Sequence, residues 1–148
     1  MRVRRDARDR GTVSIFVALS AAMMLMFVGI VLDCGGRLRA IANADALAQE
    51  AARVGGQEID QQALLTGRGL LINTAEGYAA ANAYLRPYGL HADPPDGSPP
   101  AALATSITVV INTTYRTALL GLFDTPTLTV QGTGTATLVP GDEEAGGA

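Results

Sequence analysis

A long uncharged run dominates the pattern of hydrophobic and polar positions at the start of the chain. It extends from Thr12 to Leu32 and contains no acidic or basic residue. A helix rises by about 1.5 Å per residue, so this run gives roughly 32 Å of helix, enough for a hydrocarbon core of about 30 Å. The pattern predicts a transmembrane helix over residues 12–32.

Helical periodicity continues beyond this run. Between Arg37 and Asp60, polar and charged residues fall on one side of a helix and apolar residues on the other. The apolar side is expected to hold Leu38, Ile41, Ala44, Ala48, Ala51, Ala52, Gly55 and Ile59. Small residues prevail there, so a sheet or a second helix can approach closely. We expect an amphipathic helix over residues 33–60, with the Gly35-Gly36 pair as a candidate bend.

Residues 61–139 predict a small domain that contains both helix and strand. A short helix is expected from Thr74 to Arg86, because Asn73 suits an N-cap and Glu76 stands three residues later, as in a capping box. Its core-facing residues are expected to be Tyr78, Ala81 and Leu85. Pro87 ends the helix, and turn-forming residues follow it.

Two later segments alternate with the period of a strand. Residues 106–115 place Ile107, Val109, Ile111 and Tyr115 on one side. Residues 127–138 place a row of Thr residues on one face, which we expect to be exposed to water. The opposite face contains Gly132 and Gly134, and we expect it to pack on a helix. The apolar segment between them, Ala118–Phe123, is expected to cap the core or to lie near lipid.

Together these elements predict an α+β fold of pilin-like layout. A long N-terminal transmembrane helix extends into an amphipathic helix, and a second short helix and a small antiparallel β-sheet follow. The tail, residues 140–148, is acidic and rich in Gly and is expected to be disordered.

Charge sets the expected orientation in the membrane. Five Arg residues crowd into residues 1–11 against two Asp residues, whereas the rest of the chain is acidic. Basic residues flanking a membrane helix favour the cytoplasmic side. We therefore expect a cytoplasmic basic segment over residues 1–11, membrane-flanking positions at Arg10 and Asp33, and everything after Asp33 on the extracytoplasmic side of the cell membrane.

A cleavable secretory signal is the alternative interpretation of the same N-terminal pattern. A basic start followed by an apolar run fits both interpretations, and Ala40-Ile41-Ala42 resembles a cleavage site. Signal sequences carry apolar regions of about 7–15 residues, shorter than this run. A cut there would release a secreted α+β domain that begins near Asn43.

The chain lacks the residue sets that enzymes and metal sites require. It contains one His, His91, and one Cys, Cys34, and no phosphate-binding loop or Gly-x-Ser-x-Gly motif. We therefore expect no catalytic residues, cofactor, metal, small-molecule substrate or nucleic-acid partner. Cys34 is a candidate for an intermolecular disulfide, with an inert helix-surface residue as the alternative.

The junction of the basic start and the apolar run resembles a known family. The features that carry the resemblance are Arg10-Gly11 at the membrane entry, Asp33 at its exit and the Ala-rich stretch Asn43–Ala52. They resemble the N-terminal region of TadE/TadG-like proteins, minor pilin-like components of tight-adherence (Flp-type) pilus systems. The resemblance covers about residues 10–56. It implies a possible processing site between Gly11 and Thr12, although Phe16 stands where processed members often carry Glu.

The sequence predicts a leading function and one alternative. The resemblance implies a membrane-anchored minor pilin-like protein that assists assembly or anchoring of a tight-adherence type pilus or a related secretion apparatus. Its partners would be membrane lipid and other pilin-like or pilus-assembly membrane proteins. The alternative is a single-pass envelope scaffold or accessory protein that binds another extracytoplasmic partner.

Overall fold

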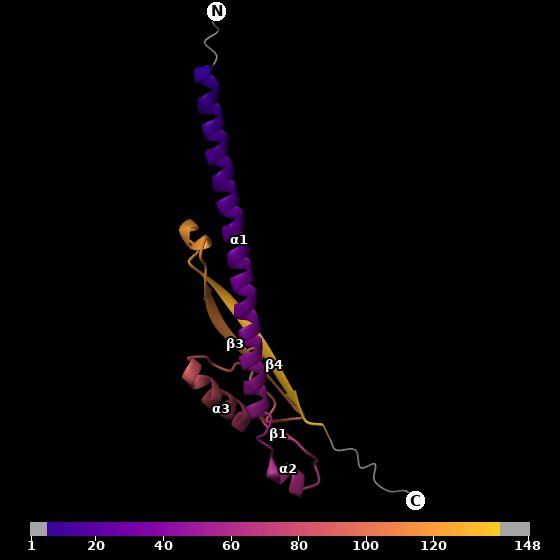
Figure 1. Ribbon diagram of the computed structural model, residues 1–148. Helices are drawn as coiled ribbons and strands as arrows, with labels where there is room; N and C mark the ends of the chain where they lie inside the picture. The colour runs from indigo at the N-terminus through magenta and orange to yellow at the C-terminus, as the bar shows by residue number, and fades with distance from the viewer. Residues whose placement is uncertain (1–5, 140–148) are drawn as a thin grey trace, which may run out of the picture. The chain divides into compact units, whose positions relative to one another are not determined.

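The computed structural model describes residues 6–139, and its longest element is the helix α1 (Asp6–Gly55), 50 residues long. Figure 1 shows it as one uninterrupted helix that runs through the Gly35-Gly36 pair, so this pair does not interrupt the helix. Among the described residues, α1 is the one helix long and apolar enough to cross a membrane. The helix ends at Gly55 rather than at Asp60. Residues 1–5 and the predicted acidic tail, residues 140–148, lie outside the described part of the chain.

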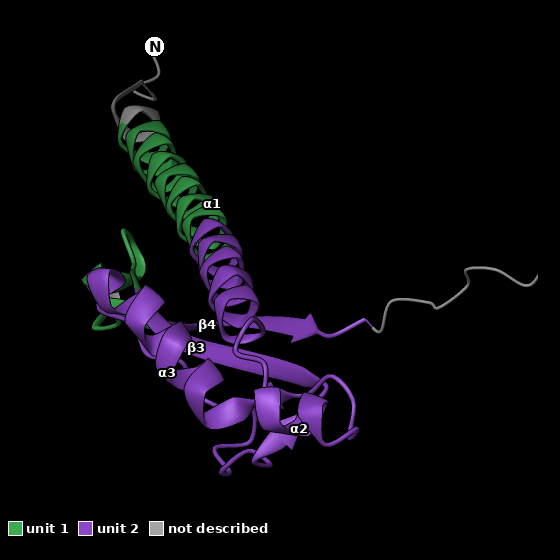
Figure 2. Cartoon of the chain, turned by 90° about the horizontal axis from the view of Figure 1, so that it is seen from below, with its two compact units in different colours: residues 1–38, 115–128 green, residues 39–114, 129–148 purple. Residues whose placement is uncertain are grey.

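The chain divides into two compact units, coloured in Figure 2. Unit 1 consists of residues 1–38 and 115–128, and unit 2 consists of residues 39–114 and 129–148. The helix α1 contributes its N-terminal part to unit 1 and its C-terminal part to unit 2.

Helices of unit 2 follow α1 along the chain. They are α2 (Gln61–Leu65), α3 (Thr74–Leu85) and the 3-10 turn η1 (Arg86–Tyr88). The predicted N-cap of α3 is confirmed, because the Asn73 side chain accepts a hydrogen bond from the Glu76 N–H at 3.3 Å. Ala81 and Leu85 are fully buried and Tyr78 is half-buried. Helix α2 was not predicted. It is a single short turn capped by Asp60, whose Oδ1 accepts from the Ala63 N–H at 2.5 Å.

Strands within the described residues form two antiparallel two-stranded sheets rather than the single sheet expected. In the first, β1 (Ile72–Asn73) pairs with β2 (Leu103–Ala104), in a register that joins Ile72 to Ala104. In the second, β3 (Ser106–Arg116) pairs with β4 (Thr127–Thr137). The predicted α+β class is confirmed, and the two alternating segments are the two long strands.

Strand β4 packs on α1 through its glycine face, as its alternation predicts. A Cβ at Gly132 would overlap the backbone of Ala44, and one at Gly134 would overlap the backbone of Ala48. The opposite face, which carries the Thr row, is exposed along the whole strand. The two glycines therefore allow strand and helix backbones to approach closely, with no side chain between them.

Side chains of α1 also bond to the backbone of β4. The Asp45 carboxylate accepts from the Thr133 N–H at 3.0 Å. The Gln49 amide donates to the Thr135 carbonyl oxygen at 2.9 Å and accepts from the Thr135 N–H at 3.2 Å. These bonds occupy polar groups of β4 that an edge strand would otherwise present to another chain.

The core of unit 2 consists of small residues on α1 and larger ones on the strands and α3. The fully buried residues include Ala48, Ala51, Ala52, Ile72, Leu85, Val109 and Ile111. Two residues expected on the packed face of α1 and its extension are exposed, Leu38 at 67% and Ile59 at 37%, and a third, Ile41, is half-buried. Leu38 precedes the stretch of α1 against which β4 packs, so no strand covers it.

Candidate functional site: the exposed apolar helix and the loop held against it

The apolar part of α1 is uncovered on nearly every side. Every large apolar side chain from Val13 to Leu32 is between 45% and 72% exposed. Soluble monomers rarely present a continuous apolar surface of this extent, because water penalises it. The exposed segment therefore needs a non-aqueous environment or a protein partner.

One residue of this segment is an exception. Gly29 is buried, because the Leu119 side chain lies directly against it. Leu119 belongs to the segment that joins β3 to β4, which we call the hairpin loop and define as Thr117–Pro126. This loop contains the 3-10 turn η2 (Leu120–Phe123) and lies beside α1 in Figure 1.

Asp33 holds the hairpin loop to α1. Its side chain is 2% exposed, and its two carboxylate oxygens accept three backbone hydrogen bonds from the loop. The N–H groups of Ala118, Leu119 and Leu120 donate to it at 2.5, 2.9 and 2.8 Å. A buried carboxylate is costly unless it is hydrogen-bonded, and here both oxygens are. Asp33, predicted as a membrane-flanking charge, therefore also has an internal role that the sequence did not indicate.

The same hydrogen bonds set the charge state of Asp33. The Leu120 N–H contributes most to lowering the pKa of the Asp33 carboxyl below its ordinary value of 3.8. Burial opposes this by disfavouring the charged form, and the N–H groups of Ala118 and Leu119 lower the pKa further. The group is therefore a carboxylate at neutral pH, which is the form that can accept all three bonds.

This lowered pKa predicts a pH dependence of the loop's attachment. A carboxyl group with a depressed folded-state pKa stabilises the folded form above its unfolded-state pKa, and that contribution disappears as the pH falls through the folded value. We expect the loop to be held fully above pH 3.8 and to be released only as the pH falls through the folded-state pKa of Asp33, which lies below that value. A carbon-13 NMR titration of the Asp33 carboxyl in detergent micelles should give a midpoint below 3.8, and the Leu120 amide resonance should move with the same midpoint. A midpoint at or above that value would contradict this account.

A second contact joins the hairpin to α1 close to Asp33. The Tyr115 hydroxyl lies where a Cβ on Gly36 would stand, whereas a Cβ on Gly35 would meet nothing within 4 Å. Gly36 therefore makes room for Tyr115, and Gly35 faces open space. The adjacent glycines form a natural matched pair for testing this contact.

We expect Gly35→Ala and Gly36→Ala to change stability in opposite directions. Ala is favoured over Gly in a helix interior, so Gly35→Ala should raise the free energy of unfolding by about 1 kcal/mol. Gly36→Ala should lower it by about 1 kcal/mol, since displacing the Tyr115 ring outweighs the gain in helix propensity. Thermal unfolding in detergent micelles, followed by circular dichroism, measures both. Equal stabilisation by the two substitutions would show that Tyr115 does not rest on Gly36.

The other predicted site residues lie along α1. Gly11 and Thr12, the possible processing site, are exposed helical residues, so the peptide bond between them would have to leave the helix before a peptidase could cut it. Arg10 also lies in α1. Cys34 is a free thiol and is exposed. Arg10, Gly11 and Thr12 are consecutive near the start of α1, and Cys34 follows Asp33 further along the same helix.

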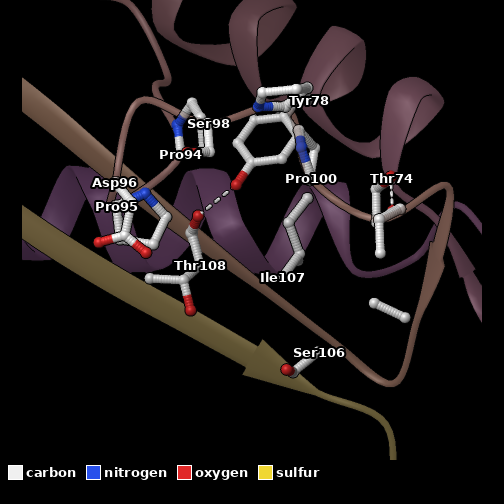
Figure 3. A pocket seen from close by; sticks show the side chains of 13 residues that line it. Thr74, Tyr78, Pro94, Pro95, Asp96, Ser98, Pro100, Ser106, Ile107 and Thr108 are labelled. Carbon is white, nitrogen blue, oxygen red and sulfur yellow. Dashed lines mark hydrogen bonds between the residues drawn. The ribbon is translucent and has the colours of Figure 1, made fainter.

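Unit 2 contains a pocket of about 300 Å³ between α3, β3 and the Pro-rich segment Pro94–Pro100. Figure 3 shows the Tyr78 side chain pointing from α3 toward Thr108 on β3, and its hydroxyl donates to the Thr108 carbonyl oxygen at 2.6 Å. Burial raises the pKa of Tyr78, so its hydroxyl stays protonated. Asp96 is the one carboxylate in the lining. The pocket offers proline and tyrosine surface for an apolar group and no pair of groups suited to acid–base or nucleophilic catalysis.

His91 lies near the other end of α3. It is exposed, as expected for a loop residue, and its Nδ1 lies 2.5 Å from the Asn82 Oδ1. The same Asn82 oxygen accepts from the Ala92 N–H at 2.9 Å. Asn82 therefore ties the end of α3 to the following loop, and His91 is part of that structural contact.

Comparisons of the chain with models of protein families, with curated proteins and with solved structures find no match. The candidate site consists of an exposed apolar helix and, beside it, a loop held by a buried carboxylate.

Proposed function

We propose that the chain is a membrane-anchored, minor pilin-like protein that assists the assembly or anchoring of a tight-adherence type pilus or a related secretion apparatus. In this proposal residues 12–32 span the cell membrane, and unit 2 lies on the extracytoplasmic side. The N-terminal part of α1 packs laterally against helices of other pilin-like or assembly proteins. Such a role needs a matching surface rather than catalysis.

One observation carries the proposal, namely the contrast between the two parts of the single helix α1. Its first part is apolar and exposed from Val13 to Leu32, whereas in its second part Ala44, Ala48, Ala51 and Ala52 are buried. One helix thus combines a segment suited to lipid or to other helices with a segment that forms the core of a folded unit. Small residues in the exposed part, such as Ala21 and Ala22, would allow close helix packing in lipid.

The Asp33 contacts favour a permanent anchor over a cleaved signal. A cut after Ala42 would remove Asp33, Gly29 and Gly36 together, and with them the partners of the hairpin loop. The three N–H groups that donate to Asp33 would lose their acceptor. In a protein whose N-terminal segment is cleaved off, we would not expect the hairpin loop to be held by residues of that segment.

Photo-crosslinking in the native membrane tests the proposal. A photoreactive residue at Met24, which is 72% exposed, should capture a pilin-like or assembly protein of the pilus apparatus. The matched control places the same group at Gln131, on the exposed face of β4, where no helix packing in lipid is expected. Absence of any pilus component among the Met24 adducts would overturn the proposal.

The pocket beside Tyr78 favours a second candidate function, an envelope scaffold that binds a different extracytoplasmic partner. Its prolines and tyrosine present an apolar surface in unit 2, apart from α1. A photoreactive group at Ser98 that captures an envelope protein, with no pilus component captured from Met24, would favour this function over the first.

A further inference from the structure

We propose that the hairpin loop is a second membrane-contacting element, which inserts Leu122 among the acyl chains of the extracytoplasmic leaflet beside α1. The inference rests on the proposed membrane span of residues 12–32. It adds to that span an anchoring point from a segment far along the chain, held in place by Asp33.

The hairpin loop lies beside the apolar segment of α1. Leu119 lies against Gly29, inside the apolar segment and about 5 Å of helix rise before its end at Leu32. The helix residues next to Gly29, Val28 and Ile30, are 55% and 45% exposed. If residues 12–32 cross the bilayer, the loop beside Gly29 must lie at the level of the outer part of the hydrocarbon core rather than in bulk water.

The side chains of the loop suit the outer part of the hydrocarbon core. No residue from Thr117 to Phe123 is charged, and Leu122 is 78% exposed. Leu122 belongs to the same short turn as Leu119, which lies against the exposed apolar segment of α1, so lipid around that segment can also cover Leu122. The uncharged part of the loop, residues 117–123, is bordered by the exposed charges Arg116 and Asp124. Charged side chains stay at the level of the head groups, so they limit the insertion to a shallow one.

Backbone N–H groups of the loop are hydrogen-bonded within the protein. Lipid offers no partner for backbone polar groups, so an irregular loop can lie in it only where these groups are bonded internally. Asp33 accepts from the N–H groups of Ala118, Leu119 and Leu120. Within the loop, the N–H groups of Thr117, Leu122 and Thr125 donate to loop carbonyls at 3.0–3.1 Å. The Thr117 hydroxyl donates to the Thr125 carbonyl at 2.6 Å. Six N–H groups of the loop therefore have partners within the protein, as a lipid environment requires.

Depth-dependent fluorescence quenching of the full chain in phosphatidylcholine vesicles tests the inference. In a Cys34→Ser background, an environment-sensitive fluorophore is attached through Leu122→Cys, and some of the lipids carry a nitroxide on the upper part of the acyl chain. Val28→Cys serves as the reference inside the span. Leu65→Cys on α2, where the side chain is 86% exposed, serves as the aqueous control.

We expect the probes at positions 122 and 28 to be quenched and the probe at position 65 to keep its emission. Adding Asp33→Ala should reduce quenching at position 122 and leave it unchanged at position 28. Quenching at position 28 without quenching at position 122 would overturn the inference and leave the membrane span intact. A blue-shifted but unquenched probe at position 122 would overturn it too, since protein rather than lipid would then cover Leu122. Absence of quenching at both positions would contradict the proposed membrane span of residues 12–32 as well.

Discussion

Gly134→Ala will lower the free energy of unfolding by about 3 kcal/mol, the upper end of the range for overpacking a well-packed site. The added methyl group would overlap the backbone of Ala48 and Gln49 on α1. A flexible side chain could rotate away, but a helix backbone cannot, so β4 must move off the helix. That movement would also break the hydrogen bonds between Gln49 and Thr135. Urea unfolding in detergent micelles, followed by circular dichroism, measures the loss.

Thr133→Ala is the matched control for this substitution. It introduces Ala into the same strand, next to Gly134, but on the exposed face. Substitutions at such surface positions usually change stability by less than about 0.5 kcal/mol. Similar effects of the two substitutions would contradict the close approach of β4 to α1, because the buried and exposed faces would then tolerate Ala equally.

Asp33→Ala will release the hairpin loop from α1. The N–H groups of Ala118, Leu119 and Leu120 lose their shared acceptor, and Ala supplies no other. Hydrogen exchange by mass spectrometry in detergent micelles should show the amides of residues 118–120 exchanging at the rate of an unprotected loop. Protection of the buried strand residues Val109 and Ile111 in unit 2 should remain.

Asp33→Asn is the conservative comparison. Its amide oxygen still accepts hydrogen bonds, but the second oxygen and the negative charge are gone. We expect protection of residues 118–120 between that of the original chain and that of Asp33→Ala. If the three amides stay protected in Asp33→Ala, then Asp33 is not what holds the loop.

Local sequence patterns predict much of this fold because the elements concerned carry regular signals. The continuation of α1 beyond the apolar segment follows from the spacing of Ala44, Ala48 and Ala52, which are buried. The cap at Asn73 follows from the polar residues at the start of α3. Strict alternation along β4 predicts both its exposed Thr face and its contact with α1.

The features that patterns do not predict depend on contacts between distant parts of the chain. Asp33 is separated by 85 to 87 residues from the amides that it binds, and in the sequence it is simply a charge at the end of an apolar run. The short strands β1 and β2 have two residues each, too few to show any period. The exposure of Leu38 depends on where β4 meets α1, which periodicity within the helix does not specify.

The loop and the helix together suggest why a small protein of this kind needs Asp33 at this position. The carboxylate lies at the end of the apolar segment, where it binds the hairpin loop through backbone groups only. The exposed Leu122 side chain of the loop therefore remains available for contact with lipid. In the proposed arrangement, this contact would resist tilting of α1 in the bilayer and so fix the surface that α1 presents to its partners.

The intact mass and membrane partition of the protein from its native cells test the central claim, a retained membrane anchor, most directly. Alkaline carbonate extraction should leave the protein in the membrane pellet, with a mass that includes residues 12–42. A chain that begins at Thr12 would also remain in the pellet and would identify processing after Gly11. A soluble chain that begins near Asn43 would contradict the account, because it would lack both the span and Asp33.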